Sequence, residues 1–149
     1  MLYTKLTKKA MNIAYEAHKD QYDKSGLPYI FHPFHLAEQM QDEVTTCIAL
    51  LHDVVEDTDI TFDTLREKGF TEEIISALQL LTHNKEIPYM EYVEKIKQDP
   101  NARKVKLADL RHNSDLTRLE EVQITEYVLK RNKKYQEAIK LLTEEDRYE

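Results

Sequence analysis

The segment VTTCIALLHDVV, residues Val44–Val55, decides the fold, because it is the most apolar stretch of the chain. Its apolar residues fall on most sides of a helical wheel, which predicts a central, buried helix. His52 and Asp53 within it need partners, since burying an unpaired charge is costly. Glu56 and Asp57 follow one helical turn later on the same two faces. This density of ionisable groups favours a cation site or a functional pocket over a buried salt-bridge network.

The remaining sequence predicts further helices, arranged as a compact all-α bundle. A length of 149 residues with 41% hydrophobic and 33% charged residues fits a single domain over residues 1–149. Two glycines are too few for the turns of a multi-stranded antiparallel sheet. Residues 22–32 are predicted to form an ordered loop. Besides the helix at residues 44–55, helices are predicted at residues 6–18, 33–41, 61–69 and 121–144. Three more are predicted to begin at Thr71, Pro88 and Pro100.

Charge and cysteine content restrict the function further. A net charge of −7 argues against non-specific nucleic-acid binding, although a local basic pocket for a phosphorylated small molecule is compatible with it. The single Cys47 excludes an intrachain disulfide and a thiolate metal cluster. The chain shows neither a secretory signal nor a membrane-length apolar run, so we expect a cytoplasmic protein without a membrane partner. The sequence is compatible with a homo-oligomer. The basic run at 130–134 is interpreted as a solvated helix face.

Two more segments contain side chains that can bind a metal. His32 lies between a Gly-Pro loop and a helix start, and Asp109 shares a helix face with His112 and Asn113 in the segment KLADLRHN. His112 is either a partner of a metal ligand or an ordinary histidine. The candidate ligands are His32, His52, Asp53 and Asp109. Such a mixed nitrogen and oxygen set suits one divalent first-row ion, Mn²⁺, Fe²⁺ or Zn²⁺, with positions left for water.

Four motifs follow one another along the chain: AHKDQYDKSGLPYIFHP (17–33), LLHDVVEDT (50–58), LLTHNKEIPYMEYV (80–93) and VKLADLRHN (105–113). In this order and spacing they resemble the HD-domain metal-dependent phosphohydrolases. The resemblance extends from about Leu6 to Leu119 and is most specific to the hydrolase domain of RelA/SpoT-type proteins and to the small alarmone hydrolases. It implies hydrolysis of the 3′-pyrophosphate of guanosine tetra- or pentaphosphate, with a small-molecule nucleotide as the partner.

Carried over residue by residue, the resemblance implies roles for individual side chains. The four candidate ligands would bind one ion, with Mn²⁺ as the leading candidate. Glu56 and Asp57 would lie beside the attacking water, and one of them would take its proton. The resemblance also implies contacts to the nucleotide and its phosphates, made by Lys24, Ser25, Lys106 and Asn113.

The chain departs from the family pattern at two cationic positions. Asp23 stands where the family usually has an arginine expected to contact the base, and the arginine next to the distant aspartate is shifted to Arg111, about 100° around a helix. The base is therefore not fixed by the motifs. The alternatives are an HD-domain phosphatase or pyrophosphatase for another nucleotide or cofactor phosphate, a non-catalytic nucleotide sensor, and a purely structural helical domain.

Overall fold

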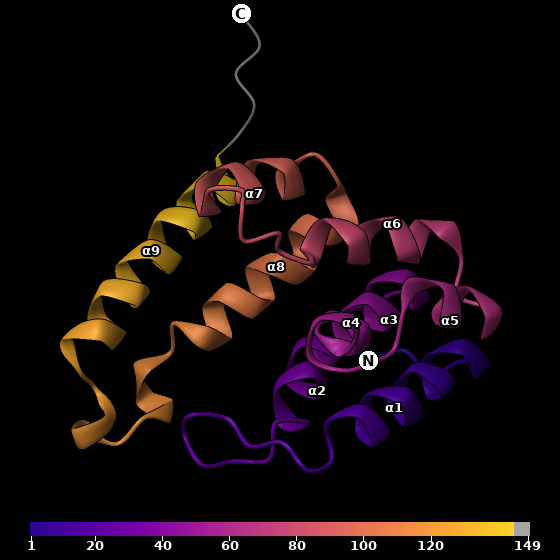
Figure 1. Cartoon of the computed structure of the whole chain (residues 1–149), viewed down its shortest axis with the longest axis horizontal. Helices are drawn as coiled ribbons and strands as arrows, with labels where there is room; N and C mark the ends of the chain where they lie inside the picture. The colour runs from indigo at the N-terminus through magenta and orange to yellow at the C-terminus, as the bar shows by residue number, and fades with distance from the viewer. Residues whose placement is uncertain (145–149) are drawn as a thin grey trace, which may run out of the picture.

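The computed structural model describes residues 1–144, and over these residues the chain is built from helices and short connections (Figure 1). The α-helices are α1 (Lys5–His18), α2 (Phe31–Glu38), α3 (Glu43–Leu51), α4 (Val54–Asp57), α5 (Phe62–Glu67), α6 (Glu72–Leu81), α7 (Tyr89–Lys97), α8 (Pro100–Asn113) and α9 (Glu126–Thr143). Two 3₁₀ turns, η1 (Leu116–Arg118) and η2 (Glu121–Gln123), join α8 to α9. Within the described residues the only β-type pairing is an isolated bridge between Tyr22 and Pro28. The predicted all-α fold is confirmed.

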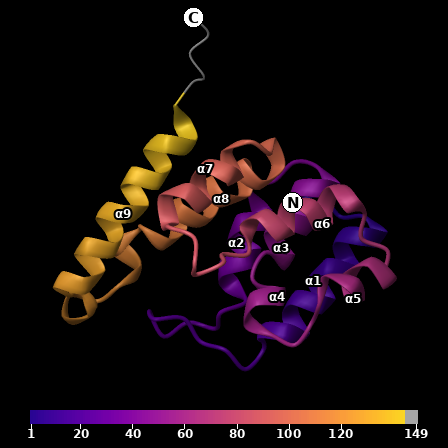
Figure 2. The ribbon, with the colours of Figure 1, turned by 45° about the horizontal axis from the view of Figure 1, so that its top comes forward.

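Helix α3 is the centre of the core, as its apolar sequence predicts. Residues 45–51 are all buried, and the helix packs against α1, α2, α6 and α8. In both ribbon views α8 lies between this central group and α9 (Figures 1 and 2). Two layers of helices therefore meet at α8, and the polar residues of α8 face the end of α3.

Several helix ends follow from the local residue types, as predicted. Pro100 is the first residue of α8, where its missing N–H costs nothing. The Thr61 hydroxyl caps α5 by accepting a hydrogen bond from the Thr64 amide at 3.1 Å. Gly69, which follows α5, has a φ of +99°, a conformation that other residues adopt only at a cost.

The predicted helix over residues 44–55 is wrong at its C-terminal end. Helix α3 ends at Leu51, and a turn at His52 and Asp53 precedes the short helix α4. Asp53 has φ −106° and ψ −1°, which bends the chain away from the α3 axis. The apolar pattern crosses this turn because Val54 is buried in the same core.

Two other boundaries also differ from the prediction. Helix α2 begins at Phe31 rather than at Pro33, so His32 lies on the helix and not in the preceding loop. A proline is compatible with this, because the first-turn N–H groups have no partner within the helix. The last helix begins at Glu126, and residues 121–123 form a 3₁₀ turn instead. Residues 145–149 of the predicted single domain lie outside the described part of the chain.

The loop between α1 and α2 is attached to the η1 and η2 region. The side-chain amide of Gln123 donates a hydrogen bond to the Lys24 carbonyl oxygen at 3.1 Å, and Arg118 forms an ion pair with Asp23 at 3.0 Å. Figure 1 shows these two connections approaching each other at the lower end of α8 and α9. Among residues 1–144, no helix combines the length and the apolarity that crossing a membrane requires.

Candidate metal centre and adjoining cavity

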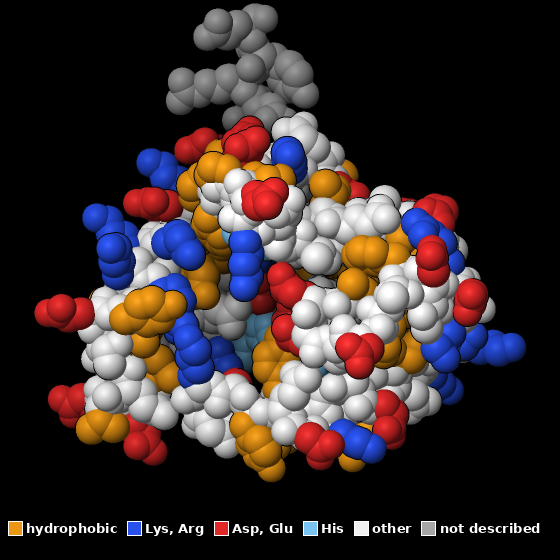
Figure 3. Space-filling model, viewed as in Figure 1, with side chains coloured by type: hydrophobic (Ala, Val, Ile, Leu, Met, Phe, Trp, Pro, Cys, Tyr) orange, Lys and Arg blue, Asp and Glu red, His pale blue; other side chains and the backbone are white. Residues whose placement is uncertain are grey.

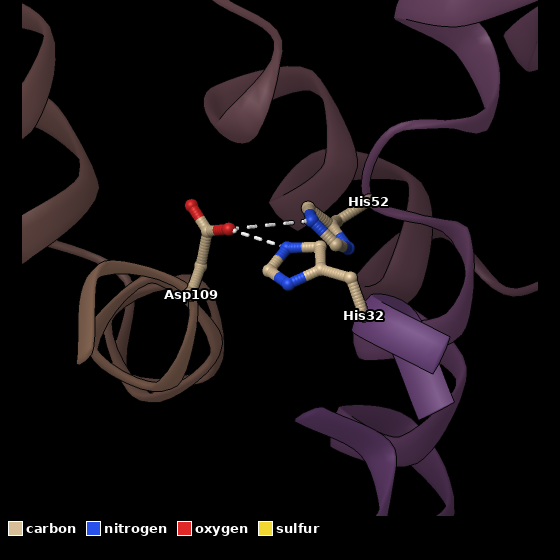
Figure 4. Close-up of side chains that lie close together, drawn as sticks. All are labelled: His32, His52 and Asp109. Carbon is tan, nitrogen blue, oxygen red and sulfur yellow. Dashed lines mark hydrogen bonds and ion pairs between the residues drawn. The ribbon is translucent and has the colours of Figure 1, made fainter. Parts of the chain in front are cut away.

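Three of the four candidate ligands converge at the junction of α2, α3 and α8. His32 comes from α2, His52 directly follows α3, and Asp109 comes from α8 (Figure 4). The Asp109 Oδ1 atom lies 2.9 Å from His32 Nε2 and 3.6 Å from His52 Nε2. All three side chains are buried, and their ligand atoms lie within 4.8 Å of one another. The cluster is small enough for a single ion to contact all three residues.

The fourth candidate, Asp53, joins this cluster through His52. Its Oδ2 atom lies 2.9 Å from His52 Nε2 and accepts a hydrogen bond from the Tyr29 hydroxyl. Burial opposes the charge of Asp53, but the neighbouring His52 lowers the pKa of this carboxyl to about 2. Asp53 is therefore ionised at neutral pH and available as an oxygen ligand.

The environment of His52 fits a cation. Its Nδ1 atom lies 2.7 Å from the Ala49 carbonyl oxygen, so Nδ1 carries a proton and donates it. Nε2 is buried and lies 2.9 Å from Asp53 Oδ2 and 3.6 Å from Asp109 Oδ1, although neither contact has the geometry of a hydrogen bond. A lone pair next to two negative charges requires a proton or a metal ion. Burial lowers the pKa of His52, yet these carboxylates raise it well above its ordinary value.

His32 is oriented in the same way by His112. The two Nδ1 atoms lie 2.6 Å apart, and the rings are stacked with centroids 4.9 Å apart. Burial and the charge of Arg118 lower the pKa of His112 to about 4, so His112 is neutral and, in the tautomer whose Nδ1 carries no hydrogen, accepts a hydrogen bond from His32 Nδ1. His32 Nε2 is then left to face Asp109. His112 is thus a partner of a candidate ligand, the first of the two interpretations that the sequence allowed.

Asp109 is held by two further residues of its own helix. Lys106 Nζ contacts Oδ2 at 3.0 Å, and Asn113 Nδ2 donates to Oδ1 at 3.0 Å. Burial opposes the charge of Asp109, but Lys106 and the two histidines hold its pKa well below the ordinary range. Lys106 was predicted to contact the nucleotide. In the structure it is partly buried, and it contacts Asp109 and lies over the Tyr92 ring.

Glu56 and Asp57 lie on α4, one turn beyond the His52–Asp53 turn, and both side chains are exposed. Although both residues are exposed, desolvation by the surrounding protein atoms raises the pKa of each carboxyl above its ordinary value, and the negative charge of Asp53 raises it further. Two carboxyls with raised pKa values next to a candidate metal centre are suited to accept protons. Their catalytic role stays a prediction.

A cavity of about 380 Å³ adjoins the metal centre. Of the predicted nucleotide contacts, Lys24, Ser25 and Asn113 line it. Two lining residues touch the candidate ligands directly, since Tyr29 bonds to Asp53 and Asn113 bonds to Asp109. Figure 3 shows the hollow in the face seen in Figure 1, with histidine at its floor, acidic side chains on one rim and Lys and Arg on the other.

The HD-domain family pattern matches residues 10–136 of the chain. The chain belongs to the HD-domain family. The resemblance predicted from the motifs is therefore confirmed, and the His/His/Asp cluster of this HD domain indicates a divalent-metal site.

Curated relatives of this HD-domain protein include guanosine-3′,5′-bis(diphosphate) 3′-pyrophosphohydrolases. MESH1 of Mus musculus is 34% identical over 165 aligned residues, which cover 91% of this chain and 92% of MESH1. The enzyme of that name from Aquifex aeolicus is 38% identical over 104 residues. The alignment covers only 14% of the Aquifex protein, and 13% of a relative from Borreliella burgdorferi.

The fold is also found in a solved structure, described as a metazoan ortholog of SpoT that hydrolyzes ppGpp. It superimposes with a TM-score of 0.76 over 96% of this chain and 88% of that chain. At 24% sequence identity the likeness concerns the fold, and it supports the HD-domain assignment.

The sequence interpretation missed part of the HD-domain cavity wall. Arg131 belongs to the basic run that was interpreted as a solvated helix face, yet it lines the cavity together with Tyr135. Its guanidinium lies 5.8 Å from the Tyr127 ring and 5.7 Å from the Tyr135 ring. The spacing of four residues from Tyr127 to Arg131 and again to Tyr135 is a signal that could have separated Arg131 from its neighbours.

Proposed function

We propose that this HD-domain protein is a metal-dependent phosphohydrolase that removes the 3′-pyrophosphate of guanosine 3′,5′-bis(diphosphate), with Mn²⁺ as its ion. The observation that carries the proposal is the convergence of His32, His52 and Asp109 beside a cavity that contains Lys24 and Arg131. The curated relatives support the choice of substrate, since those at 34–42% identity bear the name of this hydrolase.

The ion would be held by the four candidate ligands, His32, His52, Asp53 and Asp109. Two imidazole nitrogens and two carboxylate oxygens favour a divalent first-row metal over Mg²⁺ or Ca²⁺, which prefer oxygen. When bound, such an ion lowers the pKa of water and polarises a phosphoryl oxygen. A hydrogen bond from each Nδ1 atom, to the Ala49 carbonyl for His52 and to His112 for His32, would leave Nε2 of both histidines free to bind the ion.

In this proposal one of the two carboxylates, Glu56 or Asp57, accepts the proton of the attacking water. The water oxygen forms a bond to the phosphorus attached to the ribose 3′-oxygen, and the water proton passes to a carboxylate oxygen. The 3′-oxygen leaves with the bonding electron pair and takes up a proton. The products are guanosine 5′-diphosphate and pyrophosphate. Because the pKa of each carboxyl is raised, the carboxylate is a better base than an ordinary exposed one.

Lys24 and Arg131 supply the positive charge that the phosphates require. Lys24 is exposed with its ammonium 5.5 Å from the Tyr127 ring, and the Arg131 Nε atom is buried without a hydrogen-bond partner. Donors that no protein acceptor occupies are available to phosphate oxygens. The two cations would therefore hold the phosphates of the substrate on the basic side of the cavity.

The test compares three variants of the Mn²⁺-loaded protein, with guanosine 3′,5′-bis(diphosphate) as the substrate and pyrophosphate as the readout. Glu56→Gln keeps the shape of the side chain but cannot accept a proton, so we expect kcat to fall by on the order of 10²- to 10⁴-fold with the metal retained. Asp53→Ala is expected to lose both the metal and the activity. Glu94→Gln, an exposed carboxylate on α7, is the matched control and should behave as the wild type.

Two results would contradict the proposal. A wild-type protein that binds about one Mn²⁺ per chain and releases no pyrophosphate would favour the nucleotide sensor. A protein that binds no divalent metal, in the wild type as in Asp53→Ala, would favour the structural polar network.

A further inference from the structure

Arg118 in the cavity wall is held in place by hydrogen bonds from its guanidinium to other protein groups, and in this it differs from Lys24 and Arg131. Arg118 ends the η1 turn, and its Nη2 atom donates to Asp23 Oδ2 at 3.0 Å. Its Nη1 atom donates to the His112 carbonyl oxygen at 2.9 Å. The side chain is 20% exposed and that of Asp23 12% exposed, and both residues line the cavity. The guanidinium therefore has one defined orientation in the cavity wall.

Asp23 is itself rigidly placed. Its Oδ1 atom accepts hydrogen bonds from the Ser25 amide at 2.9 Å, the Ser25 hydroxyl at 2.5 Å and the Leu27 amide at 3.0 Å. One carboxylate oxygen thus closes the loop between α1 and α2, and the other binds Arg118. The aspartate found in place of the family's arginine does not leave this part of the cavity without a guanidinium, because it anchors one from η1.

The charge of Arg118 is balanced locally, which distinguishes it from Lys24 and Arg131. A guanidinium paired with a carboxylate attracts a phosphate weakly, since Asp23 repels the same anion. The phosphates should therefore bind to Lys24 and Arg131. Arg118, held by Asp23, presents hydrogen-bond donors in fixed positions to a ligand. Such donors suit an uncharged group that accepts hydrogen bonds.

The donor count indicates which uncharged group is recognised. A guanidinium has five N–H donors, and two of those of Arg118 are used within the protein. The three that remain match a base edge with two adjacent acceptors. Guanine presents such an edge in O6 and N7, and adenine presents an amino donor in place of O6. Leu119, next in the chain and on the same cavity wall, gives the base an apolar surface.

We propose that Arg118, positioned by Asp23, recognises the guanine base of the substrate through O6 and N7 and makes this HD-domain protein selective for guanine over adenine nucleotides. This inference rests on the proposed function for the placement of the nucleotide in the cavity. It assigns the selectivity to a residue outside the four motifs that predicted the family.

The test measures binding rather than turnover. Titration calorimetry with guanosine 5′-diphosphate and adenosine 5′-diphosphate, each in the presence of Mn²⁺, gives the ratio of the two Kd values. For the wild type we expect about ten-fold tighter binding of the guanine nucleotide, within the range that a bidentate arginine contact supplies. Arg118→Met should bring the ratio close to one.

Asp23→Asn isolates the positioning contact. The amide oxygen can still accept the three loop hydrogen bonds of Oδ1, whereas the amide nitrogen, in place of Oδ2, cannot accept from Arg118. We expect the ratio of Kd values to fall as in Arg118→Met, with an unchanged metal content. Arg66→Met removes a surface arginine that is also paired with carboxylates, Asp63 and Glu72, and should keep the wild-type ratio.

The outcomes separate this inference from the proposed function. A wild type that binds both diphosphates equally, or an Arg118→Met variant that weakens both by the same factor, would overturn the assignment of Arg118 to the base. A wild type that prefers the guanine nucleotide but releases no pyrophosphate would contradict the proposed reaction and leave the base contact supported. Loss of the preference in Arg66→Met as well would also refute the assignment.

Discussion

Lys106→Met tests how the buried charges of the metal centre are balanced. The ammonium of Lys106 lies 3.0 Å from Asp109 Oδ2, with 13% and 9% of the two side chains exposed. Methionine has a similar length and can pack against the Tyr92 ring, which Lys106 now covers at 5.4 Å. The substitution therefore removes the positive charge with little change in volume.

The expected loss of unfolding free energy depends on the partners that Asp109 retains in the variant. Removing one partner of a buried ion pair costs about 3–5 kcal/mol, because the other charge is left uncompensated. Asp109 retains Asn113 and the two histidines, so we expect the lower end, about 3 kcal/mol. At about 2–4 °C per kcal/mol for a domain of this size, Tm should fall by about 6–12 °C. With Mn²⁺ bound the loss should be smaller, since the ion compensates the same carboxylate.

Denaturant unfolding of the apo and Mn²⁺-loaded proteins measures both effects. Lys104→Met is the matched control, because Lys104 lies on the same helix and donates to Gln41 at 3.1 Å on the exposed surface. Its loss should stay within about 0.5 kcal/mol. The reasoning would be refuted if Lys106→Met lost no more unfolding free energy than Lys104→Met. It would also be refuted if Mn²⁺ did not reduce the difference in unfolding free energy between the wild type and Lys106→Met.

Three further outcomes follow from particular contacts. Asp42→Ala removes the cap of α3, whose carboxylate accepts from Thr45 at 2.7 Å, and should cost about 1 kcal/mol at pH 7 in urea unfolding. Burial opposes the charge of Asp42, but the hydrogen bonds from Thr45 lower its pKa. The difference in unfolding free energy between the wild type and Asp42→Ala should therefore shrink as the pH falls below the ordinary aspartate pKa, and a constant difference would contradict this. His112→Phe removes the acceptor of His32 Nδ1 and should weaken Mn²⁺ binding by about 10- to 100-fold in a chelator competition, whereas an unchanged affinity would remove His112 from the centre. Gly69→Ala should cost about 1–2 kcal/mol in urea because of the φ of +99°, and a neutral result would show that the turn relaxes.

The sequence predicted the parts of the fold that depend on local chemistry. Pro100, Thr61 and Gly69 lie at helix ends, because a missing N–H, a hydroxyl acceptor and a positive φ each act within a few residues. The central position of α3 follows from its apolar surface, which only a surrounding core can cover. The residue types predicted which side chains could bind a metal, but only the tertiary fold shows that they converge, since His32 and Asp109 are 77 residues apart.

The cavity wall could not be predicted in the same way. Arg118 and Asp23 are 95 residues apart, and neither has a local pattern that identifies the other as its partner. Arg131 lies in a basic run whose other cations, at positions 130, 133 and 134, are exposed, and only the packing of α9 on α7 and α8 decides which cation lines the cavity. Side chains of this kind are selected by tertiary contacts, to which composition and periodicity are insensitive.

The turn between α3 and α4 explains how polar groups are accommodated at the end of the most apolar helix. The last carbonyl groups of a helix lack partners within it, and His52 Nδ1 supplies a donor to one of them, that of Ala49. The same contact fixes the tautomer that leaves Nε2 facing Asp109. Asp53, which follows the helix, reaches Tyr29 on the loop before α2. A continuous helix would pair its own carbonyls along the axis, and the histidine would lose the acceptor that orients it. The helix end is therefore part of the candidate metal centre, and an insertion that extended α3 through His52 should abolish metal binding even with all four candidate ligands present.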